Sequence, residues 1–280
     1  MKIFALALCL LFVACGTPDS GSETATAALT MVSDTAPPKP VPAPAAAPPK
    51  DSFVDAPSVP GYQYLTGRFD PARHSDFVPV AARYTDGDPY LLHRETYAAF
   101  EAMHAAAMTA GIELIMVSAT RNFDRQKQIW EAKWNGRRKI ENGKRANVAY
   151  PDPTDRARAI LRYSSMPGTS RHHWGTDIDL NALNNEFFDD GEGKKIHVWL
   201  TENGPTFGFC QPYSPKGEAR PNGYEEERWH WSYLPLATRL TDYATTALGD
   251  DDISGFDGAE AAAGIGILEN YVLGISRECL

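Results

Sequence analysis

The sequence has no excess of positive charge. Its 280 residues include 36 Asp and Glu against 27 Lys and Arg, which gives a formal net charge of −9. Because binding to nucleic-acid phosphates needs a basic surface, this balance argues against a general nucleic-acid-binding protein. The length suffices for one sizeable domain with appended segments.

Long apolar runs are also missing. Residues 3–13 form an apolar run of about eleven residues, too short to span a bilayer but suited to an export signal, with Lys2 as its positive start. The run ends in Phe12-Val13-Ala14-Cys15, which resembles a bacterial lipoprotein signal whose cysteine becomes acylated. We therefore expect residues 1–15 to be a lipoprotein-type signal peptide ending at Cys15. An ordinary cleaved signal is the alternative.

Cysteines are few. The chain has four, of which Cys9 would leave with the signal and Cys15 would carry the lipid. Cys210 and Cys279 remain, and in an oxidising envelope they could form one disulfide. The sequence alone does not show that these two residues meet.

The composition divides the rest of the chain into three segments. Residues 16–55 are rich in Pro and Ala and cannot bury a core, so we expect a disordered tether there. Residues 56–245 carry the mixed polar and apolar pattern of a globular domain. Residues 246–280 begin acidic and become apolar, which predicts an extension whose helix packs back on the domain.

Periodicity indicates the elements of the domain. Helical spacing predicts helices at residues 93–111, 121–140 and 153–165, the last capped by Thr154 or Asp155, and a short helix with a loop at 194–209. Apolar or alternating runs predict strands at residues 112–120, 175–183 and 228–234. Because helices and strands do not alternate as βαβ units, we predict an α+β fold. It would be a single compact domain with a small, mainly antiparallel sheet flanked by helices.

The segment TSRHHWGTDIDLN, residues 169–181, has the residue types of a metal site. A hydrolytic zinc centre needs about three His, Asp or Glu ligands, an open position for water and a free carboxylate. Asp177 and Asp179 would face the same side of a strand, and Gly175 permits a tight turn before them. One of the histidines His172 and His173 can therefore approach the same ion as an aspartate.

The segment EEERWHWSY, residues 225–233, supplies a second histidine and a carboxylate. His230 lies among tryptophans, an apolar setting that favours the neutral imidazole that a metal ligand must be. Glu227 precedes His230 by three residues, which on a regular strand would put the two on opposite faces. Both reach one site only if the strand begins or bulges between them.

These motifs resemble a known family. Ser170-x-His172-x-x-Gly175-x-x-x-Asp179, followed by Glu227-x-x-His230, is similar to VanY-type D-alanyl-D-alanine carboxypeptidases of the M15 (LAS) group of zinc peptidases. The segment SATRNFDRQ, residues 118–126, resembles a further family motif, and the similarity spans about residues 110–235. Asp177 stands where the family motif has alanine.

The resemblance implies a LAS/hedgehog-like zinc peptidase fold with one Zn²⁺ held by His172, Asp179 and His230. Glu227 would be the general base that takes the proton of the attacking water and returns it to the leaving amine.

Arg121 would stabilise the oxyanion of the tetrahedral intermediate. Ser170, Gln126 and Trp229 would line the substrate pocket. Asp177 would be a hydrogen-bond acceptor for a ligand histidine. His173 would be a packing neighbour, although it is the alternative to His172 as a ligand.

The expected function is removal of the terminal D-Ala from peptidoglycan stem peptides. The enzyme would be a monomer held by lipid on Cys15 at the periplasmic or extracellular side of a bacterial membrane. Alternatives on the same scaffold are an L,D-carboxypeptidase, a D,D-dipeptidase and an L-Ala-D-Glu endopeptidase. A non-catalytic wall-binding lipoprotein is the alternative of another class. The basic run at residues 137–139 predicts a solvated helix face or a contact with anionic wall polymer.

Overall fold

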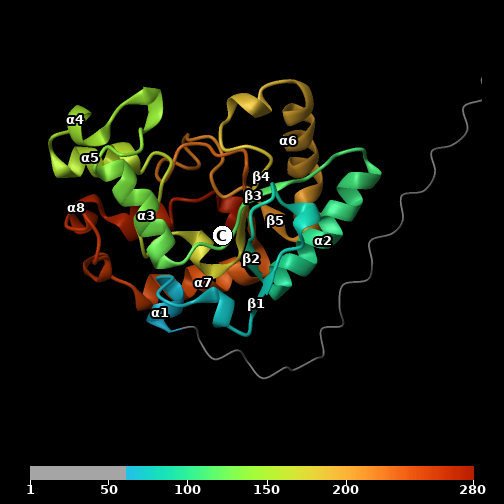
Figure 1. Cartoon of the computed structure of the whole chain (residues 1–280), viewed down its shortest axis with the longest axis horizontal. Helices are drawn as coiled ribbons and strands as arrows, with labels where there is room; N and C mark the ends of the chain where they lie inside the picture. The colour runs from blue at the N-terminus through green and yellow to red at the C-terminus, as the bar shows by residue number, and fades with distance from the viewer. Residues whose placement is uncertain (1–60) are drawn as a thin grey trace, which may run out of the picture. The chain divides into compact units, whose positions relative to one another are not determined.

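The computed structural model describes residues 61–280 (Figure 1). The signal peptide, Cys15 and the tether of residues 16–55 lie outside these described residues. The described residues all belong to one compact unit, and the division expected near residue 245 remains a prediction. Among the described residues, no helix has the length and apolar character needed to cross a membrane.

Two antiparallel sheets form the β-structure. The larger has four strands in the order β3-β4-β6-β5, and the smaller pairs β1 with β2. The strands are β1 (Phe77–Pro79), β2 (Leu91–His93), β3 (Met116–Ser118), β4 (Asp177–Leu180), β5 (Phe209–Cys210) and β6 (His230–Tyr233). This confirms the predicted α+β class with a small antiparallel sheet.

The strands are shorter than the apolar runs that predicted them. The run at residues 112–120 contributes only the three residues of β3, because its partner β4 ends where Asn181 turns the chain away with φ 64°. The run at residues 228–234 contributes four residues, because a turn precedes His230 and α7 begins at Leu234.

Eight α-helices surround the strands in the described part of the chain. The longer ones are α2 (Arg94–Thr109), α3 (Phe123–Trp134), α5 (Pro153–Ile160), α6 (Gly191–Asn203) and α7 (Leu234–Ala247). The short ones are α1 (Tyr62–Leu65), α4 (Ala146–Ala149) and α8 (Ala261–Ile265).

The cap of α5 and the end of α3 differ from the prediction for local reasons. The cap of α5 is Asp152, whose carboxylate accepts from Asp155 N at 2.9 Å, so the prediction of Thr154 or Asp155 was wrong. Pro153 follows at the first helical position, where its missing N–H costs nothing. Helix α3 ends at Trp134 instead of continuing to residue 140, because Asn135 caps it and Gly136 then turns with φ 71°.

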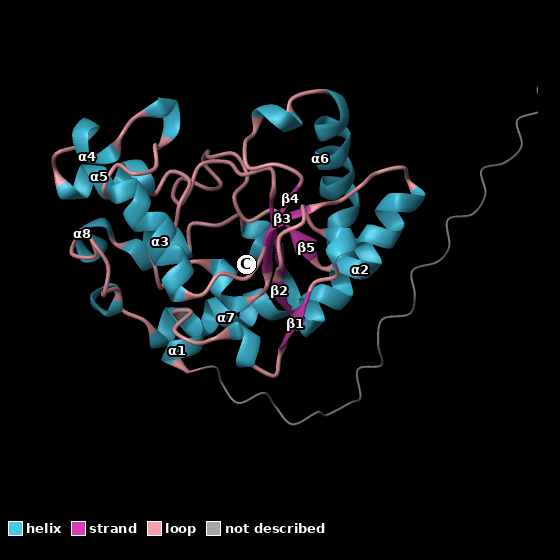
Figure 2. Ribbon diagram, viewed as in Figure 1, coloured by secondary structure: helices cyan, strands magenta, loops and turns pink. Residues whose placement is uncertain are grey.

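Two apolar cores flank the site. Helices α2 and α6 pack on the larger sheet, with Phe100, Leu200 and Trp231 fully buried between them. Helices α3 and α5 pack instead with the C-terminal extension. Figure 2 shows α3 and α5 on one side of the strands and α2 and α6 on the other. Residues of α3 line one cleft together with residues of β4 and β6, the inner strands that carry the two histidine motifs.

The C-terminal extension packs back on the domain but is not one helix. Helix α8 stops after five residues, at Gly266 with φ 66°, and short turns follow. Phe256 contacts the ring of Trp130 on α3, and Cys279 is bonded to Cys210 of β5. The extension therefore holds α3 and the edge of the sheet together.

Removing this disulfide should destabilise the domain. Cys279→Ala opens a crosslink between residues 69 positions apart, which we expect to lower the free energy of unfolding by about 2–4 kcal/mol. Equilibrium urea unfolding measures the change. The reductant TCEP should destabilise the wild type equally and leave the variant unaffected. Equal stability of variant and oxidised wild type would contradict the stabilising role.

Candidate metal centre and substrate cleft

A tight turn places the first two candidate ligands. Residues Arg171–Trp174 form a 3-10 turn that ends at Gly175, whose φ of 71° reverses the chain into β4. A side chain at position 175 would collide with the ring of Phe77 and the backbone of His93, so only glycine fits. His172 from the turn and Asp179 from β4 then lie with His172 Nε2 3.4 Å from Asp179 Oδ1.

The pairing of β4 with β6 positions the third candidate ligand, His230. Asp179 is the register partner of His230, so their side chains leave the sheet side by side. His230 Nδ1 is 3.3 Å from Asp179 Oδ1, and one ligand atom from each of His172, Asp179 and His230 lies within 4.8 Å of the others. The predicted trio thus converges.

These atoms fit a zinc ion. His172 Nδ1 bonds to the carbonyl of Ala119 at 2.8 Å, which leaves the lone pair of Nε2 free. His172 Nε2 and Asp179 Oδ1 are both buried and have no hydrogen-bond partner within residues 61–280. Orphaned buried acceptors are costly unless a cation binds them. Two imidazoles and one carboxylate are a common donor set of catalytic zinc.

Asp177 orients His230 through the ring nitrogen that points away from the cluster. Its Oδ2 lies 2.8 Å from His230 Nε2, so this nitrogen carries the hydrogen and Nδ1 points to the cluster. Burial opposes ionisation of Asp177, but the charge of the buried Arg171, together with the hydrogen bond and charge of His230, outweighs it and holds the pKa of Asp177 well below its usual range.

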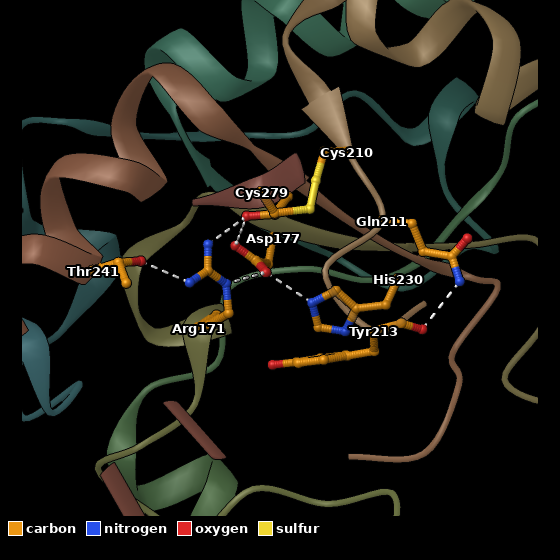
Figure 3. The surroundings of a disulfide bond; sticks show 9 residues. Arg171, Asp177, Cys210, Gln211, Tyr213, His230, Thr241 and Cys279 are labelled. Carbon is orange, nitrogen blue, oxygen red and sulfur yellow. Dashed lines mark hydrogen bonds and ion pairs between the residues drawn. A yellow bond between two sulfur atoms is a disulfide. The ribbon is translucent and has the colours of Figure 1, made fainter. Parts of the chain in front are cut away.

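Figure 3 shows this network beside the disulfide, with Arg171 donating to Asp177 at 3.2 Å and to Thr241 at 2.8 Å. Ser232 Oγ accepts from the same guanidinium at 2.9 Å. Asp177, which stands where the family motif has alanine, is thus paired with a buried counter-ion, Arg171.

The charge state of His230 follows from these neighbours. Burial lowers its pKa, but hydrogen bonds to Asp177 and Glu227 dominate and raise the pKa of His230 to about 10. In the metal-free chain both ring nitrogens of His230 therefore carry a proton at neutral pH, and the ring is positively charged. A cation that binds Nδ1 would displace the proton on that nitrogen, since metal ligands must be deprotonated.

Glu227 stands next to the cluster as the spare carboxylate. It lies in a turn before β6, closed by the bond from His230 N to the Glu227 carbonyl at 3.2 Å. The strand thus begins after Glu227. Because Glu227 is not on the strand, its side chain can reach the same site as His230 although the two are three residues apart. Its Oε2 is 3.1 Å from His230 Nδ1, and burial raises the pKa of Glu227. A carboxylate with a raised pKa beside a metal position is suited to proton transfer.

Arg121 is held at the cleft by the two histidines of the turn. Its backbone N donates to the carbonyl of His172 at 3.2 Å, and His173 Nδ1 bonds to the Arg121 carbonyl at 2.5 Å. His173 Nε2 accepts from Gly168 N at 3.0 Å, so both of its nitrogens are occupied by backbone. His173 is therefore a structural neighbour and His172 the candidate ligand. Arg121 Nε is buried without a partner in the described chain.

A cleft of about 820 Å³ opens over the cluster. Its walls include Asp179 and His230 of the cluster, together with Glu227, Arg121, Gln126 and Trp229. Gln126 donates to the Ser165 carbonyl at 2.8 Å, and its Oε1 is buried without a partner among residues 61–280.

Ser170 is placed differently. It is buried at the start of the 3-10 turn and is not among the residues that line the cleft. Its role in substrate binding stays a prediction.

Sequence reasoning missed further residues of the cleft. Tyr213 packs its ring against that of His230 with centroids 4.7 Å apart, and Lys133 lines the wall formed by α3. Lys133 follows Gln126 by seven positions, which is two turns on one helix face, so helical spacing was a usable signal. Tyr213 comes from an irregular segment, where no sequence pattern indicated its position.

Comparisons with known proteins identify the family of the chain. The family model for VanY, described as D-alanyl-D-alanine carboxypeptidase, matches residues 89–236, more than half of the chain. The putative carboxypeptidase YodJ of Bacillus subtilis (strain 168) is 31% identical over 151 residues, or 51% of this chain and 46% of that protein. A D-alanyl-D-alanine carboxypeptidase of Enterococcus faecalis (strain ATCC 700802 / V583) is 30% identical over 140 residues, or 48% of this chain and 46% of that protein.

The chain spans about half the length of these curated relatives. Among solved structures, VanYB in complex with D-alanine-D-alanine has a TM-score of 0.45 at 23% identity, covering 64% of this chain and 93% of that chain. The LdcB LD-carboxypeptidase also has a TM-score of 0.45, at 22% identity, covering 73% and 81%. The family match includes Arg121, Glu227 and all three residues of the metal cluster, and the chain belongs to the VanY family of D-alanyl-D-alanine carboxypeptidases.

Proposed function

We propose that the protein is a zinc-dependent carboxypeptidase that removes the terminal D-Ala from peptidoglycan stem peptides. One observation carries this proposal: a buried His172, Asp179 and His230 cluster faces a cleft that also holds the carboxylate of Glu227 and the guanidinium of Arg121. Zinc-assisted hydrolysis of a peptide bond uses such groups together, whereas a protein that only binds has no use for a general base.

The roles of the side chains follow from their positions. A zinc ion held by His172, Asp179 and His230 would supply Lewis-acid polarisation of the scissile carbonyl. Glu227 takes the proton of the attacking water and returns it to the amine of the leaving D-Ala. Arg121 places positive charge where the carbonyl oxygen becomes negative, and Gln126 offers an acceptor to the peptide.

The relatives support the choice of bond. The Enterococcus faecalis relative is named a D-alanyl-D-alanine carboxypeptidase, as is the family. Cleavage after an L-residue, release of a dipeptide, or endopeptidase cleavage between L-Ala and D-Glu are the alternatives on this scaffold. They share the metal and Glu227, because the walls of the cleft select the bond.

Export and lipidation complete the proposal. An apolar run that ends at Cys15 would carry the enzyme out of the cytoplasm and anchor it by lipid in the cell envelope, where peptidoglycan lies. A tether of residues 16–55 would give the domain reach away from the membrane. Metabolic labelling with a fatty-acid analogue, compared between wild type and Cys15→Ala, tests the anchor.

Incubation with purified muropeptides tests the reaction. We expect the zinc-loaded chain to remove the mass of one alanine from pentapeptides and to leave tetrapeptides intact. A chelator such as dipicolinate should stop the reaction, and added zinc should restore it. Loss of alanine from tetrapeptides would instead indicate L,D-cleavage. No change of mass in the presence of bound zinc would favour the wall-binding alternative.

A further inference from the structure

Several Lys and Arg side chains on and beside helix α3 line one wall of the cleft. Arg121 precedes the helix, Arg125 and Lys133 lie on it, and Arg138 follows it, and all four line the cleft. None of them has a carboxylate within 4.0 Å in the described part of the chain. Cations just outside the cleft are paired, as Lys127 is with Glu131 at 3.7 Å. Four unpaired cations on one wall stand out in a chain with net charge −9.

Lys133 and Arg121 are partly buried, whereas Arg125 and Arg138 are exposed. The ammonium group of Lys133 donates to Ser164 Oγ, and Ser164 in turn donates to the Tyr163 carbonyl at 2.7 Å. Burial, and after it the charge of Arg138, lowers the pKa of Lys133 to about 8, so the group is still charged at neutral pH. An ammonium with one neutral partner in a half-buried wall is poorly compensated. A bound anion would compensate it.

We propose that this wall, centred on Lys133, is a subsite for a substrate carboxylate that lies away from the cleaved bond. The inference rests on the proposed function, because it takes the ligand to be a peptide cleaved at the metal cluster. It adds the class of substrate: an acidic peptide with a free internal carboxylate, not its amidated form.

The distance along α3 indicates which carboxylate is meant. Lys133 lies seven residues beyond Gln126, which corresponds to about 10 Å along the helix axis. An extended peptide advances about 3.3–3.6 Å per residue, so this distance equals about three substrate residues. The start of α3 lies near the cluster, because Arg121 just before the helix bonds through its backbone N to the carbonyl of His172. Lys133 therefore meets an internal acidic residue, not the terminal one.

Two synthetic peptides ending in D-Ala-D-Ala test the subsite. They are identical except that the acidic residue three positions before the cleaved bond is free in one and amidated in the other. For the free peptide, Lys133→Met should lower kcat/KM about tenfold to a hundredfold, mainly through KM, as loss of a charged hydrogen bond predicts. For the amidated peptide the variant should resemble the wild type. Lys133→Arg should retain most of the preference.

A matched control separates local binding from net charge. Lys139→Met removes the same charge at an exposed position that does not line the cleft, and both peptides should be cleaved as by the wild type. Thermal unfolding verifies that each variant is folded. An equal loss for both peptides would overturn the subsite and assign Lys133 to the chemistry through Glu227. An unchanged kcat/KM for the free peptide would also overturn it.

A binding measurement keeps this proposal separate from the proposed function. Calorimetry with the Glu227→Gln chain measures peptide affinity without turnover, before and after adding Lys133→Met. Weaker binding of the free peptide alone supports the subsite, even if the wild type cleaves neither peptide and the proposed reaction fails. Weaker binding of a peptide whose only free carboxylate is terminal would overturn the assignment to an internal residue.

Discussion

Replacement of Glu227 by glutamine is expected to lower kcat by about 10³-fold or more, within or above the usual contribution of a general acid–base group. Glutamine keeps the shape of the side chain but cannot accept the proton of the attacking water. The cluster of His172, Asp179 and His230 is untouched, so the variant should bind one zinc ion per chain. Muropeptide turnover and metal analysis by mass spectrometry measure the two quantities.

Glu226→Gln is the matched control for this experiment. Glu226 is the preceding carboxylate, does not line the cleft, and pairs with Arg228 at 3.1 Å. The control should keep both activity and zinc. If Glu227→Gln loses its zinc, then Glu227 is a metal ligand and the assignment of the base is wrong.

Asp177→Ala is expected to damage both stability and metal binding. The substitution leaves the guanidinium of Arg171 buried without its carboxylate, which typically costs about 3–5 kcal/mol of folding free energy. It also frees His230 Nε2, whose orientation the carboxylate fixes, and loss of such a partner typically weakens metal binding about 10–100-fold. Urea unfolding of the metal-free chain and zinc competition against a chelator measure the two effects.

A second substitution separates these effects. In Arg171→Met combined with Asp177→Ala, the unpaired cation is gone, so most of the stability should return. Zinc affinity should stay low, because His230 still lacks its acceptor. Full zinc affinity in either Asp177 variant would show that Asp177 does not orient His230.

The resemblance to a family motif predicted the metal trio, whereas local features alone left a choice between His172 and His173 and between two aspartates. Gly175 forces the turn between His172 and β4, and alternation puts Asp177 and Asp179 on one side of the strand. What the sequence left open was the pairing of β4 with β6, a contact between residues about fifty positions apart. That register decides that Asp179 meets His230, and it depends on packing that no single segment encodes.

Other parts lay beyond sequence reasoning for identifiable reasons. Asp177 was visible as a departure from the family motif, but its partner Arg171 could be recognised only once the 3-10 turn folded back on β4. The C-terminal segment has a helical composition, yet Gly266 stops α8 early and the residues that follow contact the segment of residues 210–224. The pairing of Cys210 with Cys279 required the three-dimensional path of that segment.

The disulfide can close only after the candidate ligands have been synthesised. All candidate ligands precede residue 231, whereas the cysteine that closes the crosslink is residue 279. Every newly made chain therefore passes through a stage in which the ligands exist and the crosslink does not. Thiols stay reduced in the cytosol and oxidise outside it. A chain retained inside the cell would stay at this earlier stage, and completion of the domain would report that export has taken place.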